Sequence, residues 1–419
     1  MWRGLVFSAL LSSAALVGCQ FIDLGRDLEE MDRFSSITGE VVQVTPNGNP
    51  IAVALFSDAL KRERLINAKL IEEKDFTFGA PPGDYFLFAF EDKNGDFQYQ
   101  RSEPAGYYGD PSPVALEAGV DRSDIRIWLR PNPVLPARGE SDAAPADSAE
   151  EKFPLLWAGR KNIGAIADLE DPRFEAGPAD MGKWQPLRFS LELGPGLFLL
   201  EPYDAAKIPV LFVHGVGGTP RVWETILENL DRSRFQPWLL YYASGLPLEA
   251  NANYMFEAVT QLRVQHGFES LYLVAHSMGG LLSQAFIDRH PEDRAGYLKL
   301  FVTFSTPWGG HSAAQVGVDY APAVVPVWRD MVPTSAFLAA LRRSALPDSL
   351  PYHLAFSYRG GGFPSSVAND GAVTVASQLD LAAQARAKRI YGFNTSHAGI
   401  LSDDTAIGLL NDLLETAQE

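Results

Sequence analysis

The C-terminal half of the chain alternates short apolar runs with helix-like stretches, and this pattern restricts the fold more than any other feature. Parallel strands need a long crossover connection, usually a helix, so regular alternation predicts a parallel sheet covered by helices. We therefore expect an α/β domain over residues 207–419, with a mostly parallel sheet. The runs that carry this prediction are strands at 208–213, 271–275 and 298–304 and helical stretches at 219–230 and 279–289.

One junction in this pattern sets a serine between a strand and a helix. The apolar run 271–274 leads into the pentapeptide 275–279, Ala-His-Ser-Met-Gly, and a long apolar stretch follows. A sharp strand-to-helix turn requires small residues two positions to each side of the serine, and here they are Ala275 and Gly279. Such a turn exposes a serine hydroxyl at the edge of a sheet, where it can act as a nucleophile. Ser277 is the predicted nucleophile.

The pentapeptide resembles the nucleophile elbow of α/β-hydrolases, with Ala275 replacing the usual first glycine as in some small bacterial lipases. The resemblance extends over residues 207–419 and is strongest to bacterial triacylglycerol lipases and to deacylases related to GPI-inositol deacylase. It implies a chain order of serine, acid and histidine. Asp370 after the run 353–358, and His397 after the run 388–393, fit this order. Other acids that could take the place of Asp370 are Asp330 and Asp380.

The same family resemblance implies an oxyanion hole. A strand is followed here by His214-Gly215-Val216, and in the family the donors are the N–H groups of the residue after this glycine and of the residue after the nucleophile. These residues are Val216 and Met278. We interpret His214 as a structural histidine that braces the loop, with a catalytic role as the alternative. The segment 304–310 resembles the Thr-Pro turn that follows the sixth strand in lipases.

Residues 311–350 are expected to form a cap over the active site. The segment contains apolar stretches and a helix that Ser335 would cap, with Phe337, Leu338 and Leu341 on one face. In this fold an insertion here commonly roofs the active site. A rigid cap and a mobile lid both fit the sequence.

The extreme N-terminus predicts export and lipidation. A short basic start precedes an apolar run, 4–17, which is too short to cross a bilayer, and Gly18-Cys19 follows. This segment resembles a bacterial lipoprotein signal peptide, which implies cleavage before Cys19 and acylation of its thiol. An uncleaved anchor and an ordinary secretory signal are the alternatives. Cys19 is the only cysteine of the chain, so an intramolecular disulfide is excluded. The resemblance to lipoproteins of Gram-negative bacteria implies the outer membrane, because Gln20 and not aspartate follows the cysteine.

Short β-rich runs separated by turn residues predict a small β-sandwich between the N-terminus and residue 130, similar to transthyretin-like modules. Within it, four oxygen-bearing residues have the spacing of a calcium loop, although Phe97 stands where a glycine is expected. A plain polar loop is the alternative, and no other cofactor is expected. These residues are Asp92, Asn94, Asp96 and Glu103.

The expected organisation follows the chain from end to end. It comprises a signal peptide (1–18), a tether (19–37), the β-sandwich (38–130), a disordered linker rich in proline and acids (131–152), strands and loops that pack on the following domain (153–206), and the α/β domain (207–419). A short amphipathic segment over residues 21–36 is the alternative to the tether.

The predicted activity is hydrolysis of carboxylic esters, such as lipids, through an acyl-enzyme on Ser277. Acyl transfer by the same triad and a non-catalytic lipoprotein binding module are the alternatives. The formal net charge of −17 argues against a nucleic-acid partner. The expected partners are an ester or lipid substrate and, through the lipid anchor, a membrane of the bacterial cell envelope. The sequence leaves the oligomeric state open.

Overall fold

The computed structural model describes residues 19–43, 49–57, 65–71, 74–94, 99–100, 102–109, 112–131, 162–289, 295–360 and 367–417. The chain forms two compact units. The larger unit takes its described residues from 1–27, 164–256 and 268–419, and the smaller unit from 28–163 and 257–267. The expected signal peptide (1–18), nearly all of the expected linker (131–152), and Asp96 of the calcium loop lie outside the described residues.

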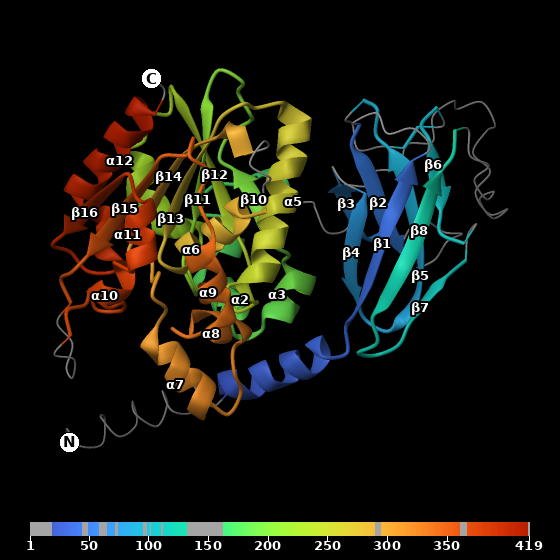
Figure 1. Cartoon of the computed structure of the whole chain (residues 1–419), viewed down its shortest axis with the longest axis horizontal. Coiled ribbons are helices and arrows are strands. Elements are labelled where there is room, and N and C mark those ends of the chain that lie inside the picture. Colours follow the sequence, from blue (N-terminus) through green and yellow to red (C-terminus); the bar gives the residue numbers. More distant parts are fainter. Residues whose placement is uncertain are drawn as a thin grey trace. The chain divides into compact units, whose positions relative to one another are not determined.

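The larger unit is built on an eight-stranded sheet (Figure 1) with the order β16-β15-β14-β13-β11-β12-β10-β9. Strands β11 to β16 pair in parallel, and β10 pairs antiparallel with β12. The strands are β9 (Ile163–Ile166), β10 (Gly196–Leu199), β11 (Ile208–Val213), β12 (Phe235–Tyr241), β13 (Leu271–His276), β14 (Leu298–Phe304), β15 (Tyr352–Ser357) and β16 (Arg389–Phe393).

Helices cover both faces of this sheet. On one face, alternate strand residues such as Phe212, Val274 and Val302 form a core with α4 and α12. On the other side lie α5 and the fully buried α6. The helices are α2 (Ala176–Trp184), α3 (Pro186–Glu192), α4 (Glu224–Glu228), α5 (Leu248–His266), α6 (Met278–Ile287), α7 (Ser312–Tyr320), α8 (Pro326–Met331), α9 (Ala336–Arg343), α10 (Val375–Gln378), α11 (Leu381–Arg386) and α12 (Asp404–Thr416); 3₁₀ turns occur at Pro172–Phe174, Pro220–Trp223, Ala295–Tyr297 and Gly399–Ser402.

The alternation of strands and helices predicted this sheet well. The expected strands 208–213 and 298–304 coincide with β11 and β14. The segment 153–206 was expected to hold only strands and loops, and this was wrong, because it also forms α2 and α3. Glycine and proline within α2 lower its intrinsic helix propensity, so the local sequence did not reveal it. Burial against the sheet stabilises the helical segment instead, since Phe189 of α3 packs edge to face against Tyr241 of β12.

The segment after Cys19 is a docked helix and not a free tether. Residues 19–31 are helical, and both carboxylate oxygens of Asp27 accept backbone N–H groups from Leu187 and Arg188, at 2.8 and 2.9 Å. Asp27 thus satisfies the open N–H groups at the start of α3, which stabilises both helices. Phe21 adds an edge-to-face contact with Trp184, with ring centroids 5.3 Å apart. Among the described residues, no helix has the length and apolar character needed to cross a membrane.

The smaller unit is the expected β-sandwich. One sheet has the order β4-β1-β8, the other has the order β3-β2-β5-β6 with β7 paired to β5, and apolar side chains of both sheets form one core. The strands are β1 (Ser35–Gln43), β2 (Ile51–Phe56), β3 (Leu65–Ile71), β4 (Asp75–Ala80), β5 (Gly83–Glu91), β6 (Ala105–Tyr107), β7 (Val114–Leu116) and β8 (Arg122–Leu129).

One residue of the candidate calcium loop, Glu103, braces a turn of this unit. Glu103 is buried, and its carboxylate accepts the backbone N–H groups of Lys93 and Gln100, at 2.9 and 2.8 Å. Within the described part of the chain, no group of three acidic, histidine or cysteine side chains could hold a metal ion.

Candidate active site

The strand-to-helix turn at Ser277 has the strained backbone expected of an elbow. Ser277 follows β13, precedes α6 and adopts φ 54° and ψ −131°, a region that non-glycine residues rarely occupy. Its N–H donates to the carbonyl of Phe304 on the neighbouring strand at 2.8 Å. A Cβ atom on Gly279 would stand 2.3 Å from the carbonyl oxygen of Val213, so only glycine fits two positions after the serine.

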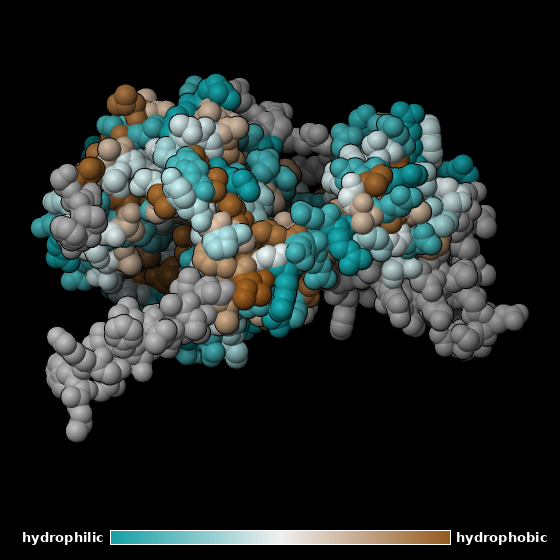
Figure 2. Space-filling view, turned by 90° about the horizontal axis from the view of Figure 1, so that it is seen from below, coloured by the Kyte–Doolittle hydropathy of each residue, from teal (hydrophilic) through white to brown (hydrophobic). Residues whose placement is uncertain are grey.

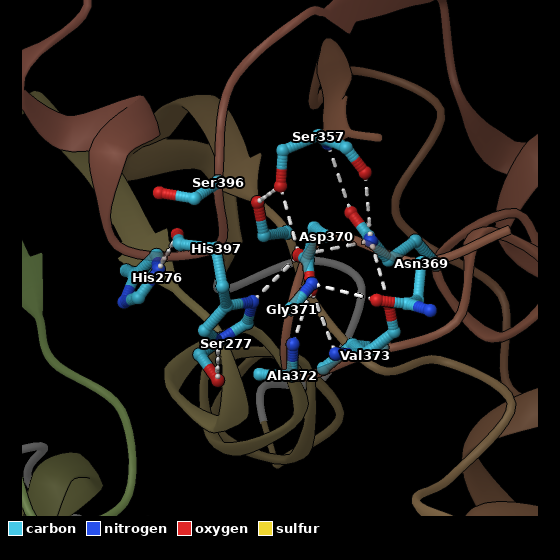
Figure 3. Close-up of polar contacts among 12 residues, drawn as sticks. His276, Ser277, Ser357, Asn369, Asp370, Gly371, Ala372, Val373, Ser396 and His397 are labelled. Atoms are coloured by element: carbon cyan, nitrogen blue, oxygen red, sulfur yellow. Dashed lines mark hydrogen bonds and ion pairs between the residues drawn. The ribbon is translucent and has the colours of Figure 1, made fainter. Parts of the chain in front are cut away.

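Three side chains from separate loops form one hydrogen-bonded series (Figure 3). Nε2 of His397 lies 2.9 Å from Oγ of Ser277, and Nδ1 of His397 lies 2.7 Å from Oδ2 of Asp370. Because an ionised carboxylate only accepts, the proton of His397 is on Nδ1, which leaves Nε2 free to accept the proton of the Ser277 hydroxyl. This arrangement can activate a serine for attack on an acyl group.

The other acids considered for this position lie elsewhere. Asp330 accepts the N–H of Leu248 at 2.7 Å, while Asp380 caps the start of α11 and pairs with Arg342. Neither makes a hydrogen bond to His397 within the described part of the chain.

Asp370 is fully buried, yet its environment favours the charged form. Burial alone raises the pKa of a carboxyl group, but the hydrogen bond and charge of His397 and the backbone N–H groups of Val373 and Ala372 outweigh it, so the pKa of Asp370 is lowered. The two backbone N–H groups reach Oδ1 at 2.7 and 3.0 Å. The acid therefore stays ionised beside the histidine.

The loop after β11 runs directly against the serine. A Cβ atom on Gly215 would stand 2.8 Å from Cβ and 3.2 Å from Oγ of Ser277, so glycine is required for this close approach. Val216 follows on this loop and is partly exposed. Met278 is the first residue of α6, a position whose N–H has no acceptor within its own helix. The two expected oxyanion donors therefore belong to the two backbone segments that flank the serine hydroxyl.

Two further histidines, His214 and His276, brace the site and are neutral. His276 is the residue before the nucleophile, and its Nε2 donates to the carbonyl of His397 at 2.9 Å. Burial, together with the charge of His397, lowers the pKa of His276 to about 3. His214 donates from Nδ1 to the carbonyl of Gly215 at 2.8 Å and stacks on Tyr242, and burial lowers its pKa to about 4. These contacts agree with a bracing role for His214.

We predict that buried neutral histidines make the larger unit less stable as the pH falls. Burial, and then the charges of Lys388 and Arg389, lower the pKa of His353 from 6.5 to about 4. Between these values the unfolded chain binds a proton that the folded chain does not. The free energy of unfolding should therefore fall by about 1.4 kcal/mol per pH unit for this histidine. Urea unfolding between about pH 7 and pH 5 should give a shallower pH dependence in His353→Gln, and equal slopes would contradict the prediction.

Three helices, α7 to α9, occupy the segment expected to form a cap, between β14 and β15. Ser335 caps α9 as predicted, with its Oγ accepting the N–H of Leu338 at 3.1 Å. The segment is tied to the loop of the acid at two points. Nε2 of His311 donates to the carbonyl of Ala372 at 2.9 Å, and the hydroxyl of Ser377 donates to the carbonyl of Gly310 at 2.5 Å.

Three residues that contact Asp370 or His397 were not among the predicted site residues. His276 could have been noticed from its place next to the nucleophile. Ser357 ends β15 and Gln378 ends α10, and both donate to Oδ2 of Asp370, at 2.8 and 3.0 Å. No sequence motif marks these two residues, because only the folded sheet brings them together.

The comparisons with known proteins agree with this fold. Residues 208–295 match a family model described as the alpha/beta hydrolase fold. A curated relative, 1-acylglycerol-3-phosphate O-acyltransferase ABHD5 of Rattus norvegicus, is 25% identical over 171 residues, which are 39% of this chain and 46% of the relative. The chain thus spans about half the length of the curated relatives it matches.

Some solved structures are similar to part of this chain at low sequence identity. Lipase BlEst2 of Bacillus licheniformis, in its mature form, is 20% identical, with a TM-score of 0.41 over 52% of this chain and 97% of that one. A carboxylesterase structure from Nitrososphaera gargenis is 13% identical, with a TM-score of 0.34 over 54% and 97%. The sheet order, the strand-to-helix turn at Ser277 and the family model over residues 208–295 together give the larger unit the α/β-hydrolase fold.

Proposed function

We propose that the protein hydrolyses carboxylic esters, with Ser277 as nucleophile, His397 as general base and Asp370 as the acid that orients the histidine. The observation that carries this proposal is the continuous series from Asp370 Oδ2 through His397 to Ser277 Oγ, with distances of 2.7 and 2.9 Å. A positioned base next to a strained serine, here nearly buried, is the arrangement that acyl transfer needs.

In the proposed reaction, His397 takes the hydroxyl proton while Ser277 Oγ attacks the ester carbonyl. The N–H groups of Val216 and Met278 donate to the oxyanion, a contribution worth about 10²- to 10³-fold in kcat per donor. His397 then protonates the leaving alcohol, which departs and leaves an acyl-enzyme. Water, deprotonated by the same histidine, attacks the acyl-enzyme and releases the acid and the free serine.

A series of p-nitrophenyl esters with increasing acyl length tests this activity and ranks the substrates. Wild-type protein should release p-nitrophenol with saturation kinetics, and Ser277→Ala should not exceed the background rate. The matched control is Ser283→Ala, which removes a buried hydroxyl in α6 and should keep wild-type turnover. Equal rates in wild type and Ser277→Ala would refute the proposal.

Acyl transfer to an alcohol is a second candidate, because it uses the same residues and differs only in the entering nucleophile. The curated relative whose name contains an acyltransferase activity is the observation that keeps this candidate open. Product analysis with added glycerol or lysolipid separates the two reactions. A hydrolase yields free acid faster than new ester, and a transferase yields the opposite.

We also propose that the substrates are lipids or other envelope esters and that Cys19 carries a lipid anchor. Cys19 is exposed, and the helix that follows it is docked on the hydrolase domain through Asp27 and Phe21. Two or three acyl chains on one residue would give stable membrane attachment, where one chain would not. Metabolic labelling with an alkyne fatty acid should mark the protein, and Cys19→Ala should remain unlabelled. Labelling of both would contradict acylation at Cys19.

Exposed apolar side chains near this helix support a lipid environment. Ile22 on helix 19–31 is 57% exposed, and on α7 Val316 and Tyr320 are 58% and 81% exposed. Trp184 contacts both Phe21 and Trp328, which links helix 19–31 to the cap. Figure 2 views the side of the molecule on which α7 and helix 19–31 lie, and hydrophobic surface is visible around them and inside a hollow.

A further inference from the structure

The carboxylate of Asp370 accepts more hydrogen bonds than its role beside a histidine requires. Oδ1 accepts the two backbone N–H groups of Ala372 and Val373. Oδ2 accepts Nδ1 of His397 at 2.7 Å, Oγ of Ser357 at 2.8 Å and Nε2 of Gln378 at 3.0 Å. An ionised carboxylate has about four lone-pair sites, so these five donors saturate it. The oxygen that faces the histidine is therefore held by two additional side chains.

The donor directions in this group are fixed by chemistry. Oγ of Ser357 lies 2.6 Å from Oγ of Ser305 and 2.8 Å from Oδ2 of Asp370. Because the carboxylate cannot donate, Ser357 gives its single proton to Asp370 and accepts the proton of Ser305. Both serines are fully buried. Ser305 directly follows β14 and Ser357 ends β15, so the carboxyl ends of two adjacent strands determine where Oδ2 lies.

Gln378 is clamped in a single orientation. Its Oε1 accepts the N–H of Ser357 at 3.0 Å, while its Nε2 donates to the carbonyl of Ser357 at 3.0 Å and to Oδ2 of Asp370. The amide is fully buried. Since the backbone N–H of Ser357 requires an oxygen opposite it, the NH₂ group must face the carboxylate. Gln378 thus joins the end of β15 to the loop that carries the acid.

We propose that Ser357 and Gln378 are positioning residues that aim Oδ2 of Asp370 at His397 and keep this carboxylate charged. The proposal rests on the triad function given above. The backbone N–H groups of Ala372 and Val373 belong to the same loop as Asp370 and move with it. Ser357 and Gln378 come from other elements and bond the same oxygen as the histidine, so they fix that oxygen relative to the sheet and to Ser277.

The test is the pH profile of kcat/KM for a soluble p-nitrophenyl ester in Ser357→Ala and Gln378→Glu. Loss of a donor leaves more negative charge on Oδ2, which makes His397 harder to deprotonate and moves the acid limb to higher pH. We expect about a tenfold loss of kcat in Ser357→Ala with a small upward shift. Gln378→Glu adds a second carboxylate, and we expect about a hundredfold loss and an upward shift of about one pH unit or more.

Two matched variants control for the loss of a buried polar group. Ser283→Ala removes a fully buried hydroxyl that has no hydrogen-bond partner within the described residues. Gln236→Glu alters a buried amide that bonds the backbone of Asp204 and Lys207 near the start of β12. Ser283→Ala and Gln236→Glu should both keep the acid limb of the kcat/KM profile at its wild-type pH. Ser357→Thr retains the hydroxyl, so its acid limb should also lie at the wild-type pH.

The outcomes distinguish a failure of the positioning role of Ser357 and Gln378 from a failure of the proposed hydrolase function. Lower activity with an unmoved acid limb in both Ser357→Ala and Gln378→Glu would overturn the positioning role. If Ser357→Ala does not fold, Ser357→Cys carries the same expectation, because a thiol of similar shape is a weak donor. Absence of fluorophosphonate labelling at Ser277 in the wild type would instead overturn the proposed function itself.

Discussion

Replacing Asp370 by asparagine should lower kcat by about 10⁴-fold with little change in KM, as expected when the histidine loses its correct tautomer. The structure gives a specific reason for so large an effect. One carboxylate oxygen accepts side-chain donors from His397, Ser357 and Gln378, and the other accepts backbone N–H groups. An asparagine NH₂ group would face donors in either orientation.

The measurement is steady-state hydrolysis of a p-nitrophenyl ester, with Asp380→Asn as the matched control. Asp380 follows Asp370 in the chain. Its side chain caps α11 and forms an ion pair with Arg342. The Asp380→Asn variant should lose some stability but keep turnover within a few-fold of wild type. A partly exposed ion pair such as that of Asp380 with Arg342 contributes about 1 kcal/mol or less to stability. Near-normal turnover in Asp370→Asn would move the acid to another residue.

Replacing Gly279 by alanine should abolish most activity and destabilise the larger unit. The new Cβ would stand 2.3 Å from the carbonyl oxygen of Val213 and 2.6 Å from that of His214. Both contacts are to backbone, so the end of β11 with the loop after it, or the start of α6, must move. Overpacking of this kind costs about 1 to 3 kcal/mol. A displacement of about 1 Å at a catalytic centre can reduce the rate about a hundredfold.

Gly408→Ala is the matched control for this substitution. Gly408 lies in α12, and a Cβ atom there would meet nothing within 4 Å. Alanine should stabilise an exposed helix position by up to about 1 kcal/mol and leave turnover unchanged. Thermal unfolding and kcat measured on both variants check the prediction, which fails if Gly279→Ala retains the stability and activity of wild type.

The sequence was informative where local chemistry decides the structure. Strand-length apolar runs predicted β11 and β14 to the residue, and the requirement for small residues around Ser277 predicted the strained elbow. The order of serine, acid and histidine along the chain pointed to Asp370 and His397, which the fold brings together. The strand and elbow signals lie within a few residues of the features they predict, whereas the order of serine, acid and histidine comes from the family resemblance.

The features that the sequence did not reveal depend on contacts between distant segments. Helix 19–31 reads as a charged tether, and only the pairing of Asp27 with the start of α3 explains its docking. Gln378 ends a four-residue helix of ordinary sequence and is 21 residues from Ser357, whose backbone it clamps. Hydrogen bonds of this kind have no periodicity or local motif.

The most direct test of the central claim is labelling of the folded full chain with a fluorophosphonate probe, followed by peptide mapping. Such probes react with a serine only where a base activates it. We expect the adduct on Ser277 in wild type and in Ser283→Ala, and no adduct in Ser277→Ala. Folded wild-type protein that stays unlabelled, or that carries its adduct on another residue, would contradict a serine hydrolase and favour a non-catalytic binding module.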